Sequence, residues 1–246
     1  MMHRNNGETD RFETLCSIPQ MKVQRLRMRN SLKVDFLQAP EAESVVAPIS
    51  GSVNVLTSSD AFSLGEKDTC YLTRGEIFSL EAPGAADVIW AQAPAEVSYP
   101  SYSRQFADAK HVVSGAQSYT RNIYTSIGEN EQANRFLVGF VEGDHGNWTS
   151  FPPHRHDGKP EVYVYYGMGE RFGVQVVAGR EDKAFVVRDG DAVMFEEGYH
   201  PNVATPGVGM NFIWIISADP KERNLSVELH PEYKDMPMGQ THLTTD

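Results

Sequence analysis

The sequence is poor in cysteine, with only Cys16 and Cys70 among its 246 residues. A chain of this length buries about 70–75% of its unfolded surface when it folds, so a substantial core can form without disulfides. Two cysteines in such a chain indicate a reduced, intracellular protein, although a single disulfide is compatible with their spacing.

Basic residues are also scarce, because 22 Lys and Arg face 33 Asp and Glu and the formal net charge is −11. A negative chain repels nucleic acid and anionic membrane surfaces, which excludes both as expected partners. No apolar stretch approaches the roughly 20 residues of a membrane span, and the first residues contain no apolar run of the kind a secretory signal requires. We therefore expect a cytoplasmic protein that does not contact membranes.

Helical periodicity is scarce, whereas short β-branched or aromatic runs are frequent. Examples are "RFLVGFV", "EVYVYY", "FGVQVVAG" and "DAVMFEE", each bounded by Gly, Pro, Asp or Asn. Such runs have the length and composition of strands. Their regular spacing predicts an all-β sandwich or barrel rather than alternating strands and helices.

A weak internal repeat indicates two similar β-units. "TRGEIFSLEAP" and "VRDGDAVMFEEGYHP" share a Gly-acid turn, an apolar strand and a following acidic residue. We expect a disordered N-terminus over 1–20, a first unit over 21–96, a polar connector over 97–126 and a second unit over 127–246. No histidine occurs between His3 and His111, so the first unit cannot form a multi-histidine site.

The stretch "FPPHRHDGKPEVYVYY" carries the clearest chemical signal. His154 and His156 are two residues apart, which on a strand places both imidazoles on one face. The turn sequence "DGKP" then predicts a hairpin that returns Glu161 to the side of the histidines. His200, in "EEGYHP" at the end of a later strand, can supply a fourth ligand.

Three imidazoles and one carboxylate suit one divalent metal ion. Zn, Mn, Fe, Co and Ni all accept such a donor set with a position left for water or substrate oxygen, and the residues do not choose among them. A lone histidine would more often be an exposed loop residue. His-x-His, a spaced glutamate and a distant histidine together favour the metal site.

These residues resemble the two motifs of the cupin double-stranded β-helix. Gly146, His154, His156, Glu161 and Gly167 fill the first motif, with slightly altered spacers. The second motif is filled by Gly190, Glu196, Gly198 and His200, with Glu196 in place of the usual Pro and a last gap one residue short.

More specifically, "RFLVGFVEGDHGNWTSFPPHRHD", "FGVQ" and "GYHP" are similar to a family of bicupin sugar isomerases. The family contains 5-deoxy-glucuronate isomerase of inositol catabolism and, as a looser match, the ketol-isomerase of 4-deoxy-5-keto-hexuronates. The resemblance is dense from Arg121 to Pro201. It implies a bicupin of two double-stranded β-helix (jelly-roll) barrels, a metal held by His154, His156, Glu161 and His200, and aldose-ketose isomerisation of an acidic or deoxy sugar.

Isomerisation also requires an acid or base near the substrate carbons and groups that bind the sugar. We expect the acid or base among Tyr199, Tyr165 and Glu196. We expect substrate contacts from Gln175, Arg171 and Tyr163, of which the tyrosine is also a possible acid or base. The family often has an arginine where this chain has Val176, and Arg171 could replace it as the clamp for a carboxylate.

Two other functions use the same residues. A cupin dioxygenase binds redox-active metal with three histidines and a glutamate, and a sugar-binding cupin keeps the barrel without catalysis. We expect a small sugar or sugar acid as the partner. Pairing of exposed sheet faces further predicts a homo-oligomer.

Overall fold

The computed structural model describes residues 1–29, 32–37, 41–156 and 158–245. Within these ranges the chain forms strands, four short 3-10 helices and loops, without an α-helix. The prediction of an all-β fold is confirmed. None of the described helices has the length and apolarity needed to cross a membrane.

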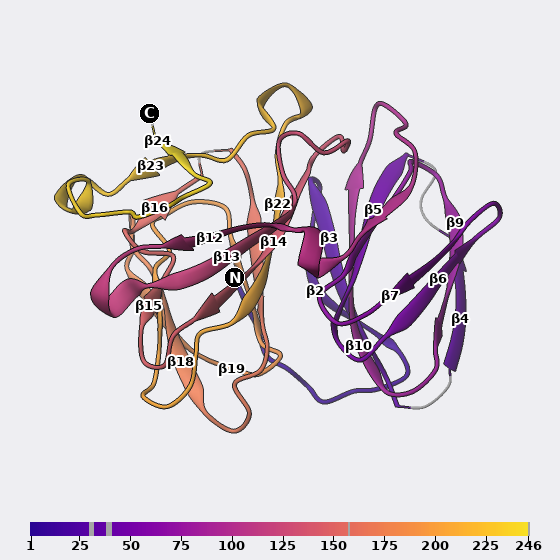
Figure 1. The fold of residues 1–246 in the computed structure, drawn as a ribbon, viewed down its shortest axis with the longest axis horizontal. Coiled ribbons are helices and arrows are strands. Elements are labelled where there is room, and N and C mark those ends of the chain that lie inside the picture. Colours follow the sequence, from indigo (N-terminus) through magenta and orange to yellow (C-terminus); the bar gives the residue numbers. More distant parts are fainter. Residues whose placement is uncertain (30–31, 38–40, 157, 246) are drawn as a thin grey trace. The chain divides into compact units, whose positions relative to one another are not determined.

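The chain divides into two compact units. The N-terminal unit contains Asn6–Ala109 and Glu129–Phe136, and the C-terminal unit contains Met1–Asn5, Lys110–Gly128 and Leu137–Asp246. Each unit consists of strands that curl around its own core (Figure 1). Each of the two repeat segments contains a strand, β9 (Ile77–Ala82) in the first unit and β20 (Ala192–Phe195) in the second.

The N-terminal unit has two sheets, in the strand orders β11-β8-β5-β10-β3-β2 and β4-β9-β6-β7. Leu26, Val55, Leu80 and Trp90 bring both sheets into one hydrophobic core. The remaining strands of this unit are β2 (Phe12–Ile18), β3 (Met21–Met28), β4 (Leu32–Leu37), β5 (Ala42–Ser50), β6 (Val53–Thr57), β7 (Ala61–Leu64), β8 (Thr69–Leu72), β10 (Ala86–Pro94) and β11 (Tyr102–Arg104).

The C-terminal unit has a seven-stranded sheet, β1-β20-β17-β22-β14-β13-β12, opposite the four-stranded sheet β15-β21-β18-β19. Leu137, Phe212 and Val187 belong to the core between them. Its strands are β1 (Met2–His3), β12 (Lys110–Ser114), β13 (Arg121–Ile127), β14 (Phe136–Gly143), β15 (Trp148–Thr149), β16 (His154–Arg155), β17 (Glu161–Tyr165), β18 (Phe172–Val177), β19 (Lys183–Arg188), β21 (Asn202–Ala204), β22 (Phe212–Ser217), β23 (Ser226–Leu229) and β24 (Thr244–Thr245).

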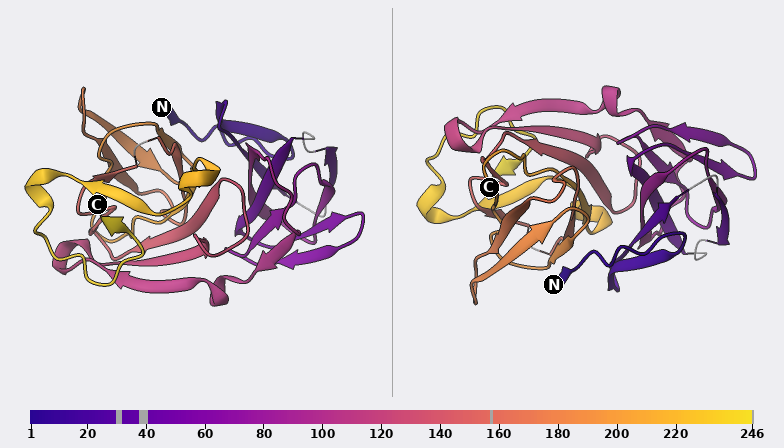
Figure 2. Two further views of the ribbon diagram at one scale, coloured as in Figure 1. Left: turned by 90° about the horizontal axis from the view of Figure 1, so that it is seen from above. Right: turned by 90° about the horizontal axis from the view of Figure 1, so that it is seen from below.

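A third sheet, β16-β23-β24, closes one end of this barrel. The C-terminal segment that carries β23 and β24 lies across that end, as the views from above and below show (Figure 2). Residues distant in sequence from the metal motif can therefore reach the barrel interior.

The N-terminus differs from the expected disordered segment over 1–20. Residues 12–18 form β2, which pairs with β3 antiparallel and buries Leu15 and Cys16. Met2 and His3 form β1 beside β20. The register shifts between Thr14 and Cys16, and this irregularity breaks the two-residue alternation that would have indicated a strand.

The expected connector over 97–126 also differs, because it contains β11, β12 and most of β13. β13 is a central strand that pairs with β12 on one side and β14 on the other. Its alternate residues Arg121, Ile123 and Thr125 line an internal cavity. The strand is polar in sequence because two of these three cavity-facing residues are polar.

Candidate metal centre

The four predicted metal ligands come together inside the C-terminal barrel. His154 lies on β16, His156 follows it, Glu161 begins β17, and His200 precedes β21. One nitrogen of each histidine lies within 4.8 Å of the corresponding atoms of the other two. Oε2 of Glu161 is 3.1 Å from Nε2 of His200 and 3.5 Å from Nε2 of His156.

Two backbone carbonyls orient the histidine rings. Nδ1 of His154 is 3.0 Å from the carbonyl oxygen of Pro152, and Nδ1 of His200 is 3.0 Å from that of Gly198. A carbonyl only accepts, so both Nδ1 atoms carry the proton and the Nε2 lone pairs remain free for a metal.

Burial keeps the imidazoles neutral. It lowers the pKa of His154 to about 3, with a further contribution from nearby His200, and it lowers the pKa of His156 well below its usual value. Burial raises the pKa of Glu161. A bound cation would compensate the charge of the carboxylate. A neutral imidazole can bind that cation without first losing a proton.

Orphaned polar atoms show that this donor set fits a cation. Within the described chain, Oε2 of Glu161 and Nε2 of His200 are buried and have no hydrogen-bond partner. Buried polar atoms normally find partners, because an unsatisfied one costs about 1–3 kcal/mol. A divalent ion would satisfy both atoms. The residues at this centre could therefore hold one metal ion.

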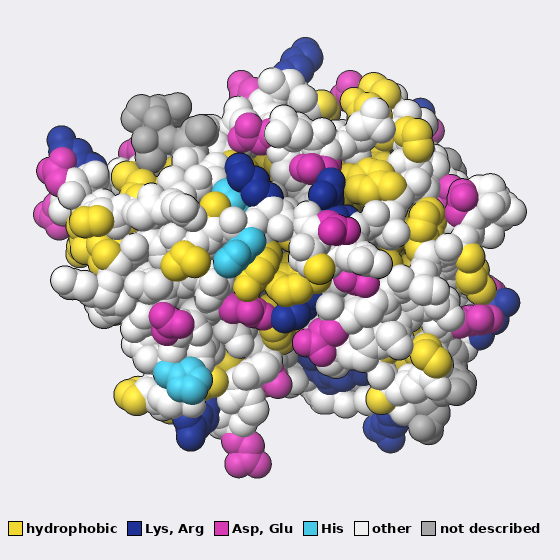
Figure 3. All heavy atoms as spheres, in the orientation of Figure 1, with side chains coloured by type: hydrophobic (Ala, Val, Ile, Leu, Met, Phe, Trp, Pro, Cys, Tyr) yellow, Lys and Arg dark blue, Asp and Glu magenta, His cyan; other side chains and the backbone are white. Residues whose placement is uncertain are grey.

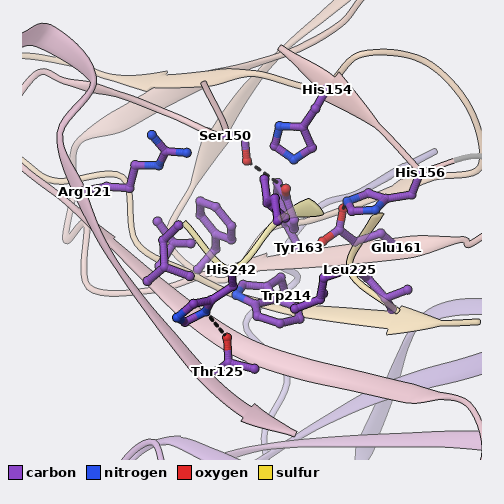
Figure 4. A pocket seen from close by; sticks show the side chains of 15 residues that line it. Arg121, Thr125, Ser150, His154, His156, Glu161, Tyr163, Trp214, Leu225 and His242 are labelled. Atoms are coloured by element: carbon purple, nitrogen blue, oxygen red, sulfur yellow. Dashed lines mark hydrogen bonds and ion pairs between the residues drawn. The ribbon is translucent and has the colours of Figure 1, made fainter. Parts of the chain in front are cut away.

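The centre opens into a cavity with a volume of about 50 Å³. Figure 4 shows Tyr163 among the cavity-lining residues beside His154, His156 and Glu161, with its hydroxyl next to Ser150. The Oη of Tyr163 and the Oγ of Ser150 are 2.8 Å apart. Burial raises the pKa of Tyr163 well above its usual value, so this hydroxyl keeps its proton.

Two other predicted residues lie behind the ligands rather than in the cavity. The hydroxyl of Tyr165 donates to Oε1 of Gln175 at 2.6 Å, and Nε2 of Gln175 donates to the carbonyl oxygen of His200 at 2.8 Å. Both side chains are fully buried. They form a polar link that fixes the backbone of His200.

Three predicted residues are not brought to the cavity. The hydroxyl of Tyr199 donates to Oε1 of Glu228 at 2.9 Å, and its ring lies under the guanidinium of Arg155. Glu196 is exposed. Arg171 is exposed as well and donates to the carbonyl oxygen of Gly207.

Sequence reasoning missed four polar residues that line the cavity, Arg121, Thr125, Ser150 and His242. Nδ1 of His242 is 2.5 Å from Oγ1 of Thr125, which joins the C-terminal segment to β13. Polar residues alternating along β13 were the available signal for Arg121 and Thr125. No local pattern marks His242, because it reaches the cavity only through the fold of the segment after β23.

On the face drawn in Figure 3, the Lys and Arg side chains of the described residues lie among acidic ones rather than in a continuous basic patch.

Comparisons with known proteins find relatives of this chain. The model of the KduI/IolB family matches residues 6–236. The 5-deoxy-glucuronate isomerase of Geobacillus kaustophilus (strain HTA426) is 28% identical over 192 residues, which cover 69% of this chain and 70% of the relative. The 4-deoxy-L-threo-5-hexosulose-uronate ketol-isomerase of Shouchella clausii (strain KSM-K16) is 25% identical over 229 residues, or 89% of this chain and 82% of the relative.

Solved structures show the same fold. A crystal structure of an IolB-like protein from Salmonella typhimurium LT2 has a TM-score of 0.88 at 15% identity and covers 95% of this chain and 97% of its own. Oxalate decarboxylase from Bacillus subtilis has a TM-score of 0.64 at 14% identity, with 82% and 69% covered. The predicted bicupin fold and the family resemblance are confirmed.

Proposed function

Because this chain belongs to the KduI/IolB family, we propose that it is a metal-dependent isomerase that interconverts an aldose and a ketose of an acidic or deoxy sugar. The named relatives are isomerases of deoxy sugar acids. His154, His156, His200 and Glu161 hold one divalent ion of the group Zn, Mn, Fe, Co and Ni.

The observation that carries this proposal is the buried donor set facing a cavity. Three buried imidazoles and a carboxylate with unsatisfied atoms are a ligand set, and the cavity beside them gives a substrate access to the ion. When bound, the ion acts as a Lewis acid toward the carbonyl and hydroxyl oxygens of the sugar.

Tyr163 is the proposed proton donor of this site. Its hydroxyl is protonated and lies at the cavity, and Ser150 is 2.8 Å away to fix its direction. Negative charge develops on a substrate oxygen during isomerisation, and a fixed donor stabilises that oxygen. We assign this role to Tyr163 in place of Tyr199, Tyr165 and Glu196, whose side chains do not line the cavity.

Gln175 and Tyr165 act as positioning residues rather than as substrate contacts. Tyr165 donates to Gln175, and Gln175 donates to the backbone carbonyl of His200, so together they position this ligand 3.1 Å from Glu161. Groups behind metal ligands commonly contribute tenfold to a hundredfold to metal affinity.

The test is isomerisation by protein loaded separately with each of the five metals. The substrates are 5-deoxy-glucuronate and 4-deoxy-5-keto-hexuronate, and NMR follows conversion while an electrode follows dioxygen. We expect conversion without dioxygen uptake, and its loss in His156→Ala. Dioxygen consumption coupled to turnover would instead support the dioxygenase, and tight sugar binding without turnover in every metal form would support the binding protein.

Three earlier expectations extend this proposal. A cytoplasmic location, a role in inositol catabolism and a homo-oligomeric state stay predictions. The oligomeric state is measured directly by light scattering on the purified chain, and a monomer at micromolar concentration would contradict it.

A further inference from the structure

We propose that Arg121 forms a carboxylate-binding subsite in the cavity, across from the metal ligands. This inference rests on the proposed function and deepens it, because it states which end of the sugar the chain recognises. Figure 4 shows Arg121 on one side of the cavity and His154, His156 and Glu161 on another. A sugar acid that spans them places its carbonyl end at the metal and its carboxylate at the arginine.

Arg121 is a buried cation without an acidic partner. Its side chain belongs to a residue with 2% exposure, and its one hydrogen bond runs from Nη1 to the carbonyl oxygen of Tyr119 at 3.3 Å. Among the described residues, no carboxylate pairs with it.

The two other buried cations of the described chain are satisfied. Arg25 donates from Nε to Oδ1 of Asp87 at 2.7 Å. Nζ of Lys159 donates to two oxygens of Asn224 and to Oγ of Ser226. Arg121 is therefore the exception, and it is the only one of the three that lines this cavity.

The charge persists despite burial. Burial lowers the pKa of Arg121 to about 10, which still leaves the guanidinium protonated at neutral pH. A charge taken out of water is costly unless an opposite charge compensates it. An anionic ligand supplies that compensation.

The surrounding backbone fixes the guanidinium in place. Arg121 pairs with Ser114 on β12 and with Gly143 on β14, so its backbone is held from both sides. Gly115 has φ of +86°, and a Cβ there would lie 2.7 Å from Nη1 of Arg121. The glycine therefore leaves the space that the guanidinium occupies.

A carboxylate is the anion that this setting fits best. The guanidinium fork matches a carboxylate with two parallel hydrogen bonds. The cavity wall offers few competing donors, because much of it is apolar: Ile123, Val141, Phe212, Trp214, Ile216 and Leu225. A neutral sugar would leave the arginine without a counter-charge, so the subsite selects acids.

The experiment compares binding of D-glucuronate and D-glucose to metal-loaded protein by calorimetry, with no turnover required. We expect wild type to bind the uronate about tenfold to a hundredfold more tightly than the neutral sugar. Arg121→Gln should remove this preference, and Arg121→Lys should retain part of it. Arg171→Gln is the matched control, since that arginine is exposed, and it should bind as wild type does.

Folding and function are separated as follows. Metal content and the thermal midpoint establish whether Arg121→Gln is folded. If Arg121→Gln is not folded, the uronate preference of Arg121→Lys decides, and a full wild-type preference in Arg121→Lys overturns the proposal. An unchanged preference in folded Arg121→Gln also overturns it. Inorganic phosphate is added as a competitor: displacement of the uronate only in proteins with Arg121 supports an anion site at this residue. Uronate selectivity through Arg121 without isomerisation would leave the subsite standing and refute the isomerase.

Discussion

At the scale of the residue, the metal centre depends on four side chains at or next to the ends of short strands. His156→Ala removes one imidazole from a set of four buried donors, so we expect metal content to fall from near one ion per chain to near zero. Mass spectrometry of purified protein measures it. The barrel should stay folded, because its core does not depend on the ion.

Arg155 provides the matched control for that variant. It lies between the two histidines but points outward, where its guanidinium donates to Glu228. Arg155→Ala should keep the metal. Equal metal content in His156→Ala and wild type would show that the ion, if present, is held elsewhere.

The hydroxyl of Tyr163 is testable by itself. Tyr163→Phe keeps the ring that stacks on Phe212 at 4.1 Å and removes the donor beside Ser150. We expect kcat to fall about 100-fold, with KM and metal content little changed, because the donor acts on charge that develops during reaction. A variant with wild-type kcat would refute the role.

The residues of the centre were largely predictable, and the residues of the cavity were not. His154, His156 and Glu161 are close in sequence, and the two-residue period of a strand indicates that the two histidines share a face. The expected hairpin does not form, because β16 pairs with β23 while β17, which carries Glu161, pairs with β20 and β22. Arg171 was chosen as the clamp because it lies near the motif, yet the structure leaves it on the surface. Arg121 reaches the cavity through strand pairing, which single-sequence patterns do not specify.

At the scale of the element, the C-terminal segment closes the cavity with a histidine that is sensitive to acid. Burial lowers the pKa of His242 to about 4, with smaller contributions from Lys110 and His111. The ordinary value, which the unfolded chain has, is about 6.5. The unfolded state therefore binds a proton first as pH falls, and stability is lost between about 6.5 and about 4.

We expect hydrogen exchange in the segment after β23 to accelerate as pH falls through that window, after correction for the intrinsic pH dependence of exchange. The loss corresponds to about 1–3 kcal/mol at most, since His242 is only partly enclosed. His242→Gln cannot gain the proton, so its exchange should change less with pH. His145→Gln, in an exposed loop, should behave as wild type. Identical pH profiles for wild type and His242→Gln would contradict the prediction.

The strands that sequence reasoning missed share one physical cause. β2 contains a register shift, and β13 places arginine and threonine where apolar residues were expected. In both strands the local alternation of apolar and polar residues is interrupted. In β2 the cause is the irregular pairing with β3, and in β13 it is the lining of the cavity. Strands with two apolar faces, such as β20 in "DAVMFEE", are fully buried and were recognised.

At the scale of the whole molecule, sequence reasoning predicted two β-units but not their boundaries. Residues 129–136 follow β13 of the C-terminal unit, yet they belong to the N-terminal unit. A single buried carboxylate explains why residues 129–136 belong to the N-terminal unit. Glu43 on β5 is fully buried and accepts backbone hydrogen bonds from Asn134 at 2.7 Å and Arg135 at 2.8 Å. The hydroxyl of Tyr71 donates to the same side chain at 2.8 Å.

Replacing this carboxylate tests whether it holds the segment in its unit. Glu43→Gln puts a donor where the backbone amides need an acceptor, so we expect a loss of about 2–5 kcal/mol in the unfolding free energy of the N-terminal unit. Amide hydrogen exchange, measured by mass spectrometry, should become faster in peptides of 6–109 and 129–136. Metal content should stay unchanged, because the metal ligands belong to the other unit.

Glu41→Gln is the control for that variant, since Glu41 is an exposed residue that pairs with Arg74 at the surface. A surface pair of this kind contributes at most about 1 kcal/mol, so its exchange pattern should match wild type. Wild-type exchange in Glu43→Gln would mean that the apolar contacts of the unit fix the segment without the carboxylate. A parallel loss of metal in Glu43→Gln would mean instead that the two units do not keep their stability independently.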